Sequence, residues 1–279
     1  MRPVRILLLA VLGLAACSPG RHDPGGDDTT GADAPSGSGS ASEASLVYAH
    51  SGSVLYRVDS ISLSVVEIGA MTGLGGQSLT DLAVDKSGNM VGITLDKLYS
   101  IDPTTAAVTL IKDLSQDASG FTSLSYIPTD LSDPSSADIL VSANDQGDVY
   151  QIDPSAGTAT KIGSYGTVAA GKVVSSGDLI GVRGLGIYAT VDVGSQTNDY
   201  LAEIDPTTWA ATPLGTGTGF DHIFGLAFWA GTIYGFVDDG TGQGKMITID
   251  KTTGVATQIN TGTQEWFGAG VTTDAPVIE

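Results

Sequence analysis

The feature that most constrains the fold is a short phrase that recurs five times, each copy an apolar run that ends in an aspartate. The five aspartates are Asp59, Asp102, Asp153, Asp205 and Asp250, so successive copies are 43, 51, 52 and 45 residues apart. A nearly constant period in this range is typical of repeat architectures, in which each copy forms one supersecondary unit. We therefore expect the chain to fold as a ring or a stack of similar units.

The residues around each aspartate predict a hairpin. In the copy that ends at Asp102, Ile101 is apolar and Ser100 is polar, and the other four copies keep this order at the same two positions. Nine residues after each aspartate the chain is aliphatic again, at Ile68, Ile111, Ile162, Leu214 and Ile259. A strand, a turn and a returning strand in one register explain this pattern. Because an aspartate accepts hydrogen bonds from the amides of a turn, we interpret the five as turn residues rather than a ring of metal ligands.

Two further strand-like segments precede each hairpin. The clearest set is 223–229, 232–237, 245–250 and 256–260. Four antiparallel strands in about 45 residues are typical of a propeller blade. Segments 80–84 and 121–127 begin two other blades in the same way, whereas the glycine-rich stretch 163–186 predicts the least regular blade.

The two ends of the repeat region complement each other. Segment 46–50 corresponds to the second strand of a blade, and segment 266–272 resembles a first strand with nothing after it. We therefore predict an all-β fold, a five-bladed β-propeller of four-stranded antiparallel blades, with one blade closed by the N- and C-terminal strands. An open solenoid is the alternative, and it would require polar capping repeats at both ends.

The repeated phrase also carries a family resemblance. Leu-Tyr-x-Ile-Asp-Pro-x-Thr, complete in residues 98–105, resembles the degenerate propeller repeats of bacterial secreted proteins and is loosely similar to the NHL and quinoprotein-like groups. This resemblance implies the fold. It implies no activity, because the Trp-Asp ending of WD repeats and the tryptophan-docking pattern of quinoproteins are not visible.

The first residues predict export and lipidation. Arg2 and Arg5 precede the apolar run 6–14, which is shorter than a membrane-spanning helix and typical of a secretory signal. The run ends in Leu14-Ala15-Ala16-Cys17, which resembles the lipobox of bacterial lipoproteins. The resemblance implies a signal peptide over 1–16, cleavage before Cys17, and acylation of its thiol by palmitate-like chains. An ordinary signal peptide with a chance cysteine is the alternative.

The segment that follows predicts a tether. Residues 17–44 contain the lipidated Cys17 and then mostly Ser, Gly, Asp, Pro and Ala, which bury too little apolar surface to offset the entropy of ordering. The propeller domain is expected over 45–279. By the same resemblance, Ser18 after the cysteine favours the outer membrane over the inner, so we expect a lipid-anchored protein of the cell envelope.

The charge excludes one class of partner. The chain has 31 acidic and 12 basic residues, a formal net charge of −19. Such a polyanion repels phosphates, so we expect no nucleic-acid ligand and no membrane contact except through the lipid on Cys17. Cys17 is the only cysteine, so the domain is expected to have no disulfide, and we expect a monomer.

Motifs for catalysis are sparse. Outside the predicted tether only His50 and His222 could act as a general base, and the chain has no Gly-x-Ser-x-Gly elbow. Asp81 is the one carboxylate that we place in the middle of an innermost strand, and glycoside hydrolysis needs two. No cofactor is predicted, although the acidic loops 192–199 and 238–240 have oxygen ligands that could hold Ca²⁺.

A binding surface is the leading functional hypothesis. Loops between blades carry ligand sites in propellers, and in this chain they contain aromatic and polar side chains that suit a protein or carbohydrate ligand. The candidate ligand-binding residues are Gln77, Phe121, Asp221, His222, Glu265 and Trp266. We interpret Phe224 and Phe267 as packing between blades. The hypothesis is a non-catalytic binding or assembly module; the alternative is a metal-dependent propeller hydrolase acting on glycans or lactones.

Overall fold

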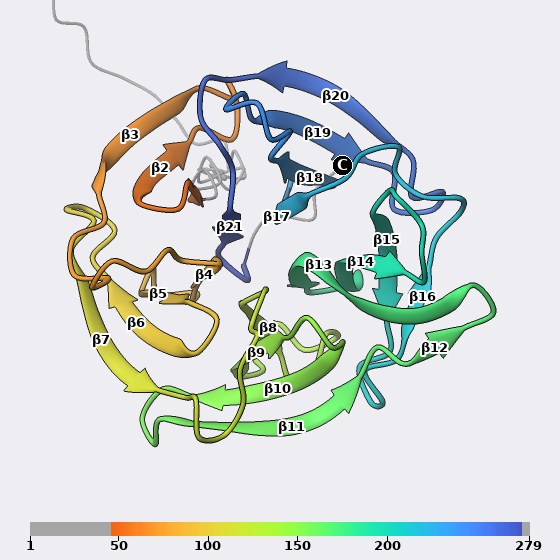
Figure 1. Cartoon of the computed structure of the whole chain (residues 1–279), viewed down its shortest axis with the longest axis horizontal. Coiled ribbons are helices and arrows are strands. Elements are labelled where there is room, and N and C mark those ends of the chain that lie inside the picture. Colours follow the sequence, from red (N-terminus) through yellow and green to blue (C-terminus); the bar gives the residue numbers. More distant parts are fainter. Residues whose placement is uncertain (1–45, 275–279) are drawn as a thin grey trace, which may run out of the picture. The chain divides into compact units, whose positions relative to one another are not determined.

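The computed structural model describes residues 46–274, which form five antiparallel sheets around a common centre (Figure 1). The predicted signal peptide, Cys17 and the tether lie outside the described residues. The predicted five-bladed β-propeller is confirmed, and the described residues contain strands and turns without a helix. No helix in this part of the chain is therefore long and apolar enough to cross a bilayer.

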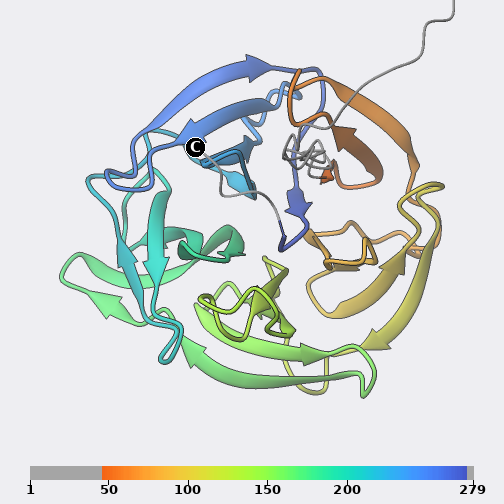
Figure 2. The same cartoon turned by 180° about the vertical axis from the view of Figure 1, so that it is seen from behind.

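Each sheet is one blade, whose strands follow one another from the centre outward (Figures 1 and 2). Blade one is β21 (Gly268–Val271), β1 (Val47–His50), β2 (Val54–Val58) and β3 (Val65–Ala70). Blade two is β4 (Asp81–Val84), β5 (Met90–Ile93), β6 (Lys97–Ile101) and β7 (Val108–Asp113). Blade three is β8 (Ser125–Pro128), β9 (Asp138–Ala143), β10 (Asp148–Asp153) and β11 (Thr158–Ser164). Blade five is β17 (Ile223–Trp229), β18 (Thr232–Val237), β19 (Lys245–Ile249) and β20 (Ala256–Thr261).

Blade four departs from the others, as the glycine-rich stretch predicts. It consists of β13 (Gly171–Val182), β14 (Gly186–Val193), β15 (Tyr200–Ile204) and β16 (Ala211–Pro213), with the short β12 (Thr167–Val168) paired to the start of β13. The pairing of β13 with β14 shifts register between Ser175 and Leu179, so β13 bulges there. Asp178 lies at the end of this bulge, directly before Leu179, where regular pairing with β14 resumes.

The chain closes its ring as predicted. β1 pairs antiparallel with β21, with Val47 opposite Val271 and His50 opposite Gly268. Both ends of the described chain therefore contribute to blade one. This pairing excludes the open solenoid.

The five aspartates are turn residues, as their spacing predicts. In every copy the Oδ1 atom accepts hydrogen bonds from the amides two and three residues later, at 2.7–3.1 Å. The residue four positions after each aspartate donates its amide to the aspartate carbonyl and has a φ between 58° and 71°. These left-handed residues are Leu63, Ala106, Gly157, Trp209 and Gly254. One turn geometry therefore repeats around the ring.

Removing one of these carboxylates tests the turn. We expect Asp102→Ala to lower the urea midpoint of unfolding, because the amides of Thr104 and Thr105 then lose their acceptor. These bonds also lower the pKa of Asp102, so its contribution is present at neutral pH and is lost as the pH falls below about 4. The control is Asp145→Ala, at an exposed aspartate whose carboxylate accepts from the side chain of Gln146, and an equal effect of the two variants would contradict this role.

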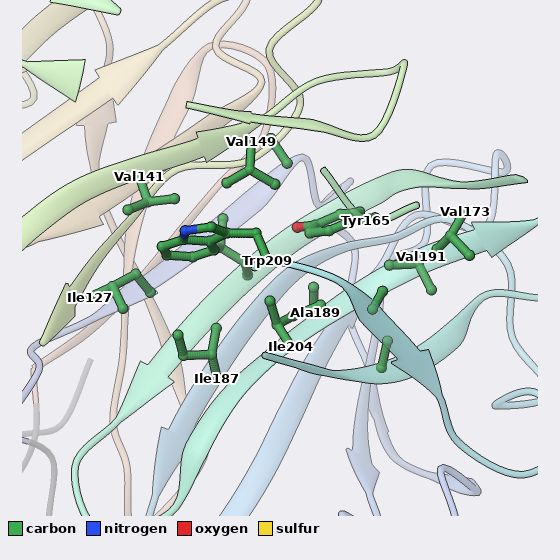
Figure 3. Close-up of a cluster of buried hydrophobic side chains, with 14 of the residues drawn as sticks. Ile127, Val141, Val149, Tyr165, Val173, Ile187, Ala189, Val191, Ile204 and Trp209 are labelled. Atoms are coloured by element: carbon green, nitrogen blue, oxygen red, sulfur yellow. The ribbon is translucent and has the colours of Figure 1, made fainter. Parts of the chain in front are cut away.

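The core lies between neighbouring blades. Figure 3 shows one such cluster, where Ile127, Val141 and Val149 of blade three face Ile187, Ala189 and Ile204 of blade four. Trp209 and Tyr165 lie between the two sets, and both are buried. Trp209 occupies the left-handed turn position, so the repeated turn also delivers a large side chain to the core.

Small residues occupy the centre, where the blades converge. A Cβ on Gly225 of β17 would lie 2.7 Å from the amide nitrogen of Ala269 on β21. A Cβ on Gly268 would lie 3.0 Å from Cα of Asp81 on β4. Both separations are too short for non-bonded heavy atoms, so the close approach of innermost strands requires glycine at these two positions.

Candidate functional site

The candidate loops gather on one face of the propeller. Gln77 precedes β4, Phe121 precedes β8, and Asp221 and Glu265 precede β17 and β21. The starts of neighbouring innermost strands lie side by side, as the contacts of Gly225 and Gly268 show. We call this side the entry face, formed by the loops before β4, β8, β17 and β21. The aspartate turns lie on the opposite face, because each follows the third strand of its blade, which runs in the same direction as the innermost strand and ends on the far side.

Four of the six candidate residues are accessible there. Gln77, Asp221, His222 and Glu265 are exposed. Gln77 accepts a hydrogen bond from the hydroxyl of Tyr99 at 3.2 Å, so its amide group is partly held in place. Polar groups that could contact a ligand therefore surround this face.

The two aromatic candidates are in the core instead. Phe121 is fully buried and packs edge-to-face on Tyr150, with ring centroids 5.6 Å apart. Trp266 is 1% exposed and packs between Tyr56 and Phe236, each 5.5 Å away and nearly perpendicular. Their position in loops between blades suggested that both side chains are accessible to a ligand. Instead, both rings point inward and pack against residues of two neighbouring blades.

Another set of rings is accessible in their place. His222 stacks on Phe224, with centroids 5.3 Å apart and planes 21° apart, and Phe224 lies 6.1 Å from Phe267. Phe224 and Phe267 are half-buried, and His222 is exposed with a φ of 58°. We call these three residues the aromatic row. It spans from blade five to blade one, so Phe224 and Phe267 do contact each other between blades, as interpreted, and both remain partly accessible.

Two carboxyl groups meet at the centre. Asp81 at the start of β4 and Asp178 in the bulge of β13 lie close enough for a hydrogen bond between their carboxyl groups. An ionised carboxylate can only accept hydrogen bonds, so a hydrogen bond between the two side chains requires one of them to be protonated. Burial, followed by the charge of Asp178, raises the pKa of Asp81 well above its usual value. Burial also raises the pKa of Asp178 well above its usual value.

Each carboxyl group also accepts hydrogen bonds from the amide of the residue that follows it and from one amide of the next blade. Asp81 accepts hydrogen bonds from Leu82 at 2.8 Å and Leu124 at 2.6 Å, and Asp178 accepts from Leu179 at 2.6 Å and Leu226 at 2.7 Å. The side chains are 0% and 1% exposed, so solvent does not reach them. The expectation that Asp81 stands alone is wrong. Because the pair is sealed and fully bonded, its role is to join blades two, three, four and five.

His50 lies beside this pair. It is fully buried, and its Nδ1 atom lies 2.8 Å from the carbonyl oxygen of Ser51, which assigns the proton to Nδ1. Its Nε2 atom has no hydrogen-bond partner. Burial lowers the pKa of His50 to about 4, so the ring is neutral at physiological pH. A Cβ on Gly268 would clash with both the Asp81 carboxyl and the His50 ring.

A second acidic group lies on the entry face, where Asp192, Asp199 and Asp221 come together. One carboxylate oxygen from each lies within 4.8 Å of the other two. Asp199 is fully buried and accepts the amide of Ile223 at 2.7 Å through Oδ2. Burial, with smaller contributions from the charges of Asp192 and Asp221, raises the pKa of Asp199 to about 7. The sequence predicted the acidic loop 192–199, which contains Asp192 and Asp199, as a possible cation site. Asp221, the third residue of this acidic group, was predicted as a ligand-binding residue.

Known proteins are similar to this chain in fold alone. No protein-family model matches the sequence, and no curated protein matches it. A chain in the crystal structure of a nidogen/laminin complex is 11% identical over 84% of this chain and 99% of its own length, with a TM-score of 0.52. A protein of unknown function from Bacteroides caccae is 10% identical over 77% of this chain and 73% of its own, with a TM-score of 0.40. At 11% identity, the similarity to the chain of the nidogen/laminin complex shows the fold alone.

Proposed function

We propose that this protein is a lipid-anchored β-propeller of the cell envelope that acts as a non-catalytic binding or assembly module. The observation that carries the proposal is the aromatic row, His222, Phe224 and Phe267, on the entry face. The exposed ring of His222 and the half-buried rings of Phe224 and Phe267, together with the exposed Asp221 and Glu265, offer both apolar contact and hydrogen-bond acceptors. This combination suits a protein or carbohydrate ligand.

The sealed centre supports a binding role over hydrolysis. A pair of carboxyl groups in a propeller funnel is the arrangement that glycoside hydrolysis uses, but there the groups must contact the sugar. The carboxyl oxygens of Asp81 and Asp178 instead accept hydrogen bonds from four backbone amides, and the two groups contact each other. A ligand would therefore meet the aromatic row and not the central pair.

Mutation of the aromatic row tests the binding surface. Binding of the purified protein would be measured on a glycan array and, separately, by chemical cross-linking to proteins in an envelope extract. We expect Phe267→Ser to abolish the wild-type signal, whereas Val255→Ser, a substitution at a side chain that is 53% exposed on the opposite face, should keep it. Loss of signal with Val255→Ser, or an unchanged signal with folded Phe267→Ser, would contradict this surface.

The anchor has a separate test. Cys17→Ser removes the thiol that the lipobox resemblance assigns to acylation. We expect the variant to move from the membrane pellet to the soluble fraction, because no other segment of 18–44 is apolar enough to hold it on a membrane. Ser18→Ala is the matched control and should stay in the pellet. Continued pelleting of Cys17→Ser would contradict lipidation.

A metal-dependent hydrolase acting on glycans or lactones is the second candidate. Its supporting observation is the group of Asp192, Asp199 and Asp221 beside the exposed His222, because acidic oxygens can hold a metal and a histidine can transfer a proton. Purified protein would be screened against glycosidase and lactonase substrates with CaCl₂ and with EDTA. Turnover that EDTA removes and that Asp199→Asn abolishes would replace the binding proposal.

A further inference from the structure

Three separate segments bring acidic side chains to one point on the rim of the entry face. Asp192 is near the end of β14, Asp199 lies in the loop that leads to β15, and Asp221 precedes β17. Their carboxylate oxygens lie within 4.8 Å of one another. The three side chains differ in exposure: Asp199 is fully buried, Asp192 is half-buried and Asp221 is exposed. The group therefore forms a cup with a buried floor and one side open to water.

The floor of this cup has an unpartnered acceptor. Asp199 bonds the amide of Ile223 through Oδ2, but its Oδ1 atom is buried and has no hydrogen-bond partner. A buried carboxylate oxygen without a partner is costly unless a cation or a proton compensates it. Among the ion pairs of residues 46–274, only His222 reaches the group, at 3.8 Å from Asp221, and no lysine or arginine does. Within residues 46–274, therefore, no lysine or arginine compensates this negative charge.

We propose that Asp192, Asp199 and Asp221 form a calcium site between blades four and five. Oxygen atoms bound to one Ca²⁺ at about 2.4 Å can be separated by up to about 4.8 Å, and the spacing in this group falls within that limit. Mg²⁺ binds oxygens at about 2.1 Å in a strict octahedron, so it would draw the three groups closer together. Water completes the coordination on the open side.

The site has a structural consequence for the aromatic row. Asp221 is adjacent to His222, whose amide donates to Asp221 Oδ1 at 3.1 Å. A cation held by Asp192 and Asp199 of blade four and by Asp221 before blade five would fix this rim loop in place. The proposal does not depend on the proposed function, because the cation binds whether or not a ligand occupies the aromatic row.

Calorimetric titration of the chelator-treated full-length protein in detergent with CaCl₂ tests the site. We expect saturable binding in the wild type and a thermal unfolding midpoint that rises with CaCl₂. Asp221→Asn should weaken the affinity at least about tenfold, because it removes one charged ligand. This side chain is exposed, so the variant should fold. MgCl₂ should bind more weakly than CaCl₂.

Two controls separate a defined site from a diffuse acidic surface. Asp145→Asn makes the same charge change at an exposed aspartate outside the group and should keep wild-type affinity, and so should Phe267→Ser. Saturation absent up to about 10 mM CaCl₂, above the range of extracellular calcium modules, would overturn the proposal. Wild-type affinity in both Asp221→Asn and Asp192→Asn, or an equal loss in Asp145→Asn, would also overturn it.

Discussion

Replacing Asp81 by alanine is expected to lower the free energy of unfolding by about 2–6 kcal/mol, because each of the two buried amides that lose their acceptor costs about 1–3 kcal/mol. The variant leaves the buried amides of Leu82 and Leu124 without their acceptor and leaves Asp178 without its partner. Urea unfolding followed by circular dichroism measures the change. Asp178→Ala should cost a similar amount, and the double variant should cost less than the sum of the two, because the residues are in contact.

Ser123 provides the matched control for this prediction. It is equally buried at the corresponding position of blade three, and its hydroxyl accepts one hydrogen bond, from the amide of Ala143 at 2.8 Å. Ser123→Ala should cost about 1 kcal/mol, as expected for a single neutral hydrogen bond. An equal cost for Ser123→Ala and Asp81→Ala would show that the carboxyl pair has no special role in joining the blades.

The same pair makes stability depend on pH. The folded pKa values of Asp81 and Asp178 are raised above the unfolded values, so the pair's contribution is fully present below about pH 4 and is lost as the pH rises through the folded pKa values. His50 acts in the opposite sense between about pH 4 and 6.5, because burial lowers its pKa. The wild type should therefore be compared with Asp81→Asn/Asp178→Asn at each pH. The stability difference should move in favour of the variant as the pH rises.

The repeat shows how much of the fold can be predicted from local chemistry. Each hairpin is encoded within about ten residues by alternation, by an aspartate and by the turn that follows it. The observed register confirms this, since Ser100 pairs with Thr109 and Gln151 pairs with Thr160, the same offset in different blades. Closure was also predictable, because segments 46–50 and 266–272 are the missing parts of one blade.

The centre was less predictable, because it depends on an irregular strand. Asp178 lies where β13 bulges, so the stretch around it does not alternate as a strand should, and it was not recognised as innermost. Gly225 and Gly268 could be recognised as small, but the reason for their size is a contact with a neighbouring blade that no local pattern contains. The acidic group on the rim likewise depends on three segments that only the ring brings together.

The aromatic candidates show the limit of reasoning from loop position. A ring in a loop between blades can face a ligand or can pack between the blades, and the sequence pattern is the same in both cases. Phe121 and Trp266 point inward, whereas Phe224 and Phe267 remain half-exposed. A clue for Trp266 is Gly244, where a Cβ would lie 2.6 Å from the indole Nε1 atom. This glycine leaves room for the ring, but the pairing of the two residues is visible only in three dimensions.

Replacing Trp266 by alanine is expected to lower the free energy of unfolding by about 3–5 kcal/mol, the cost of removing a large buried aromatic side chain. The indole lies between Tyr56 of blade one and Phe236 of blade five, so its loss opens a cavity where the ring of blades closes. Each edge-to-face pair adds about 0.5–1.5 kcal/mol beyond burial. Thermal and urea unfolding measure the change.

The neighbouring residue separates a core role from a ligand role. Phe267 is half-buried on the entry face, so Phe267→Ala should cost much less stability than Trp266→Ala while it removes part of the aromatic row. Trp266→Phe should recover part of the lost stability, because a smaller ring still fills some of the cavity. If Trp266→Ala unfolded at the wild-type midpoint and lost only ligand binding, the indole would have to reach the ligand. Since the indole is 1% exposed, we expect Trp266→Ala to lower the stability. Any loss of ligand binding in this variant should then be a consequence of the disrupted packing between blades one and five.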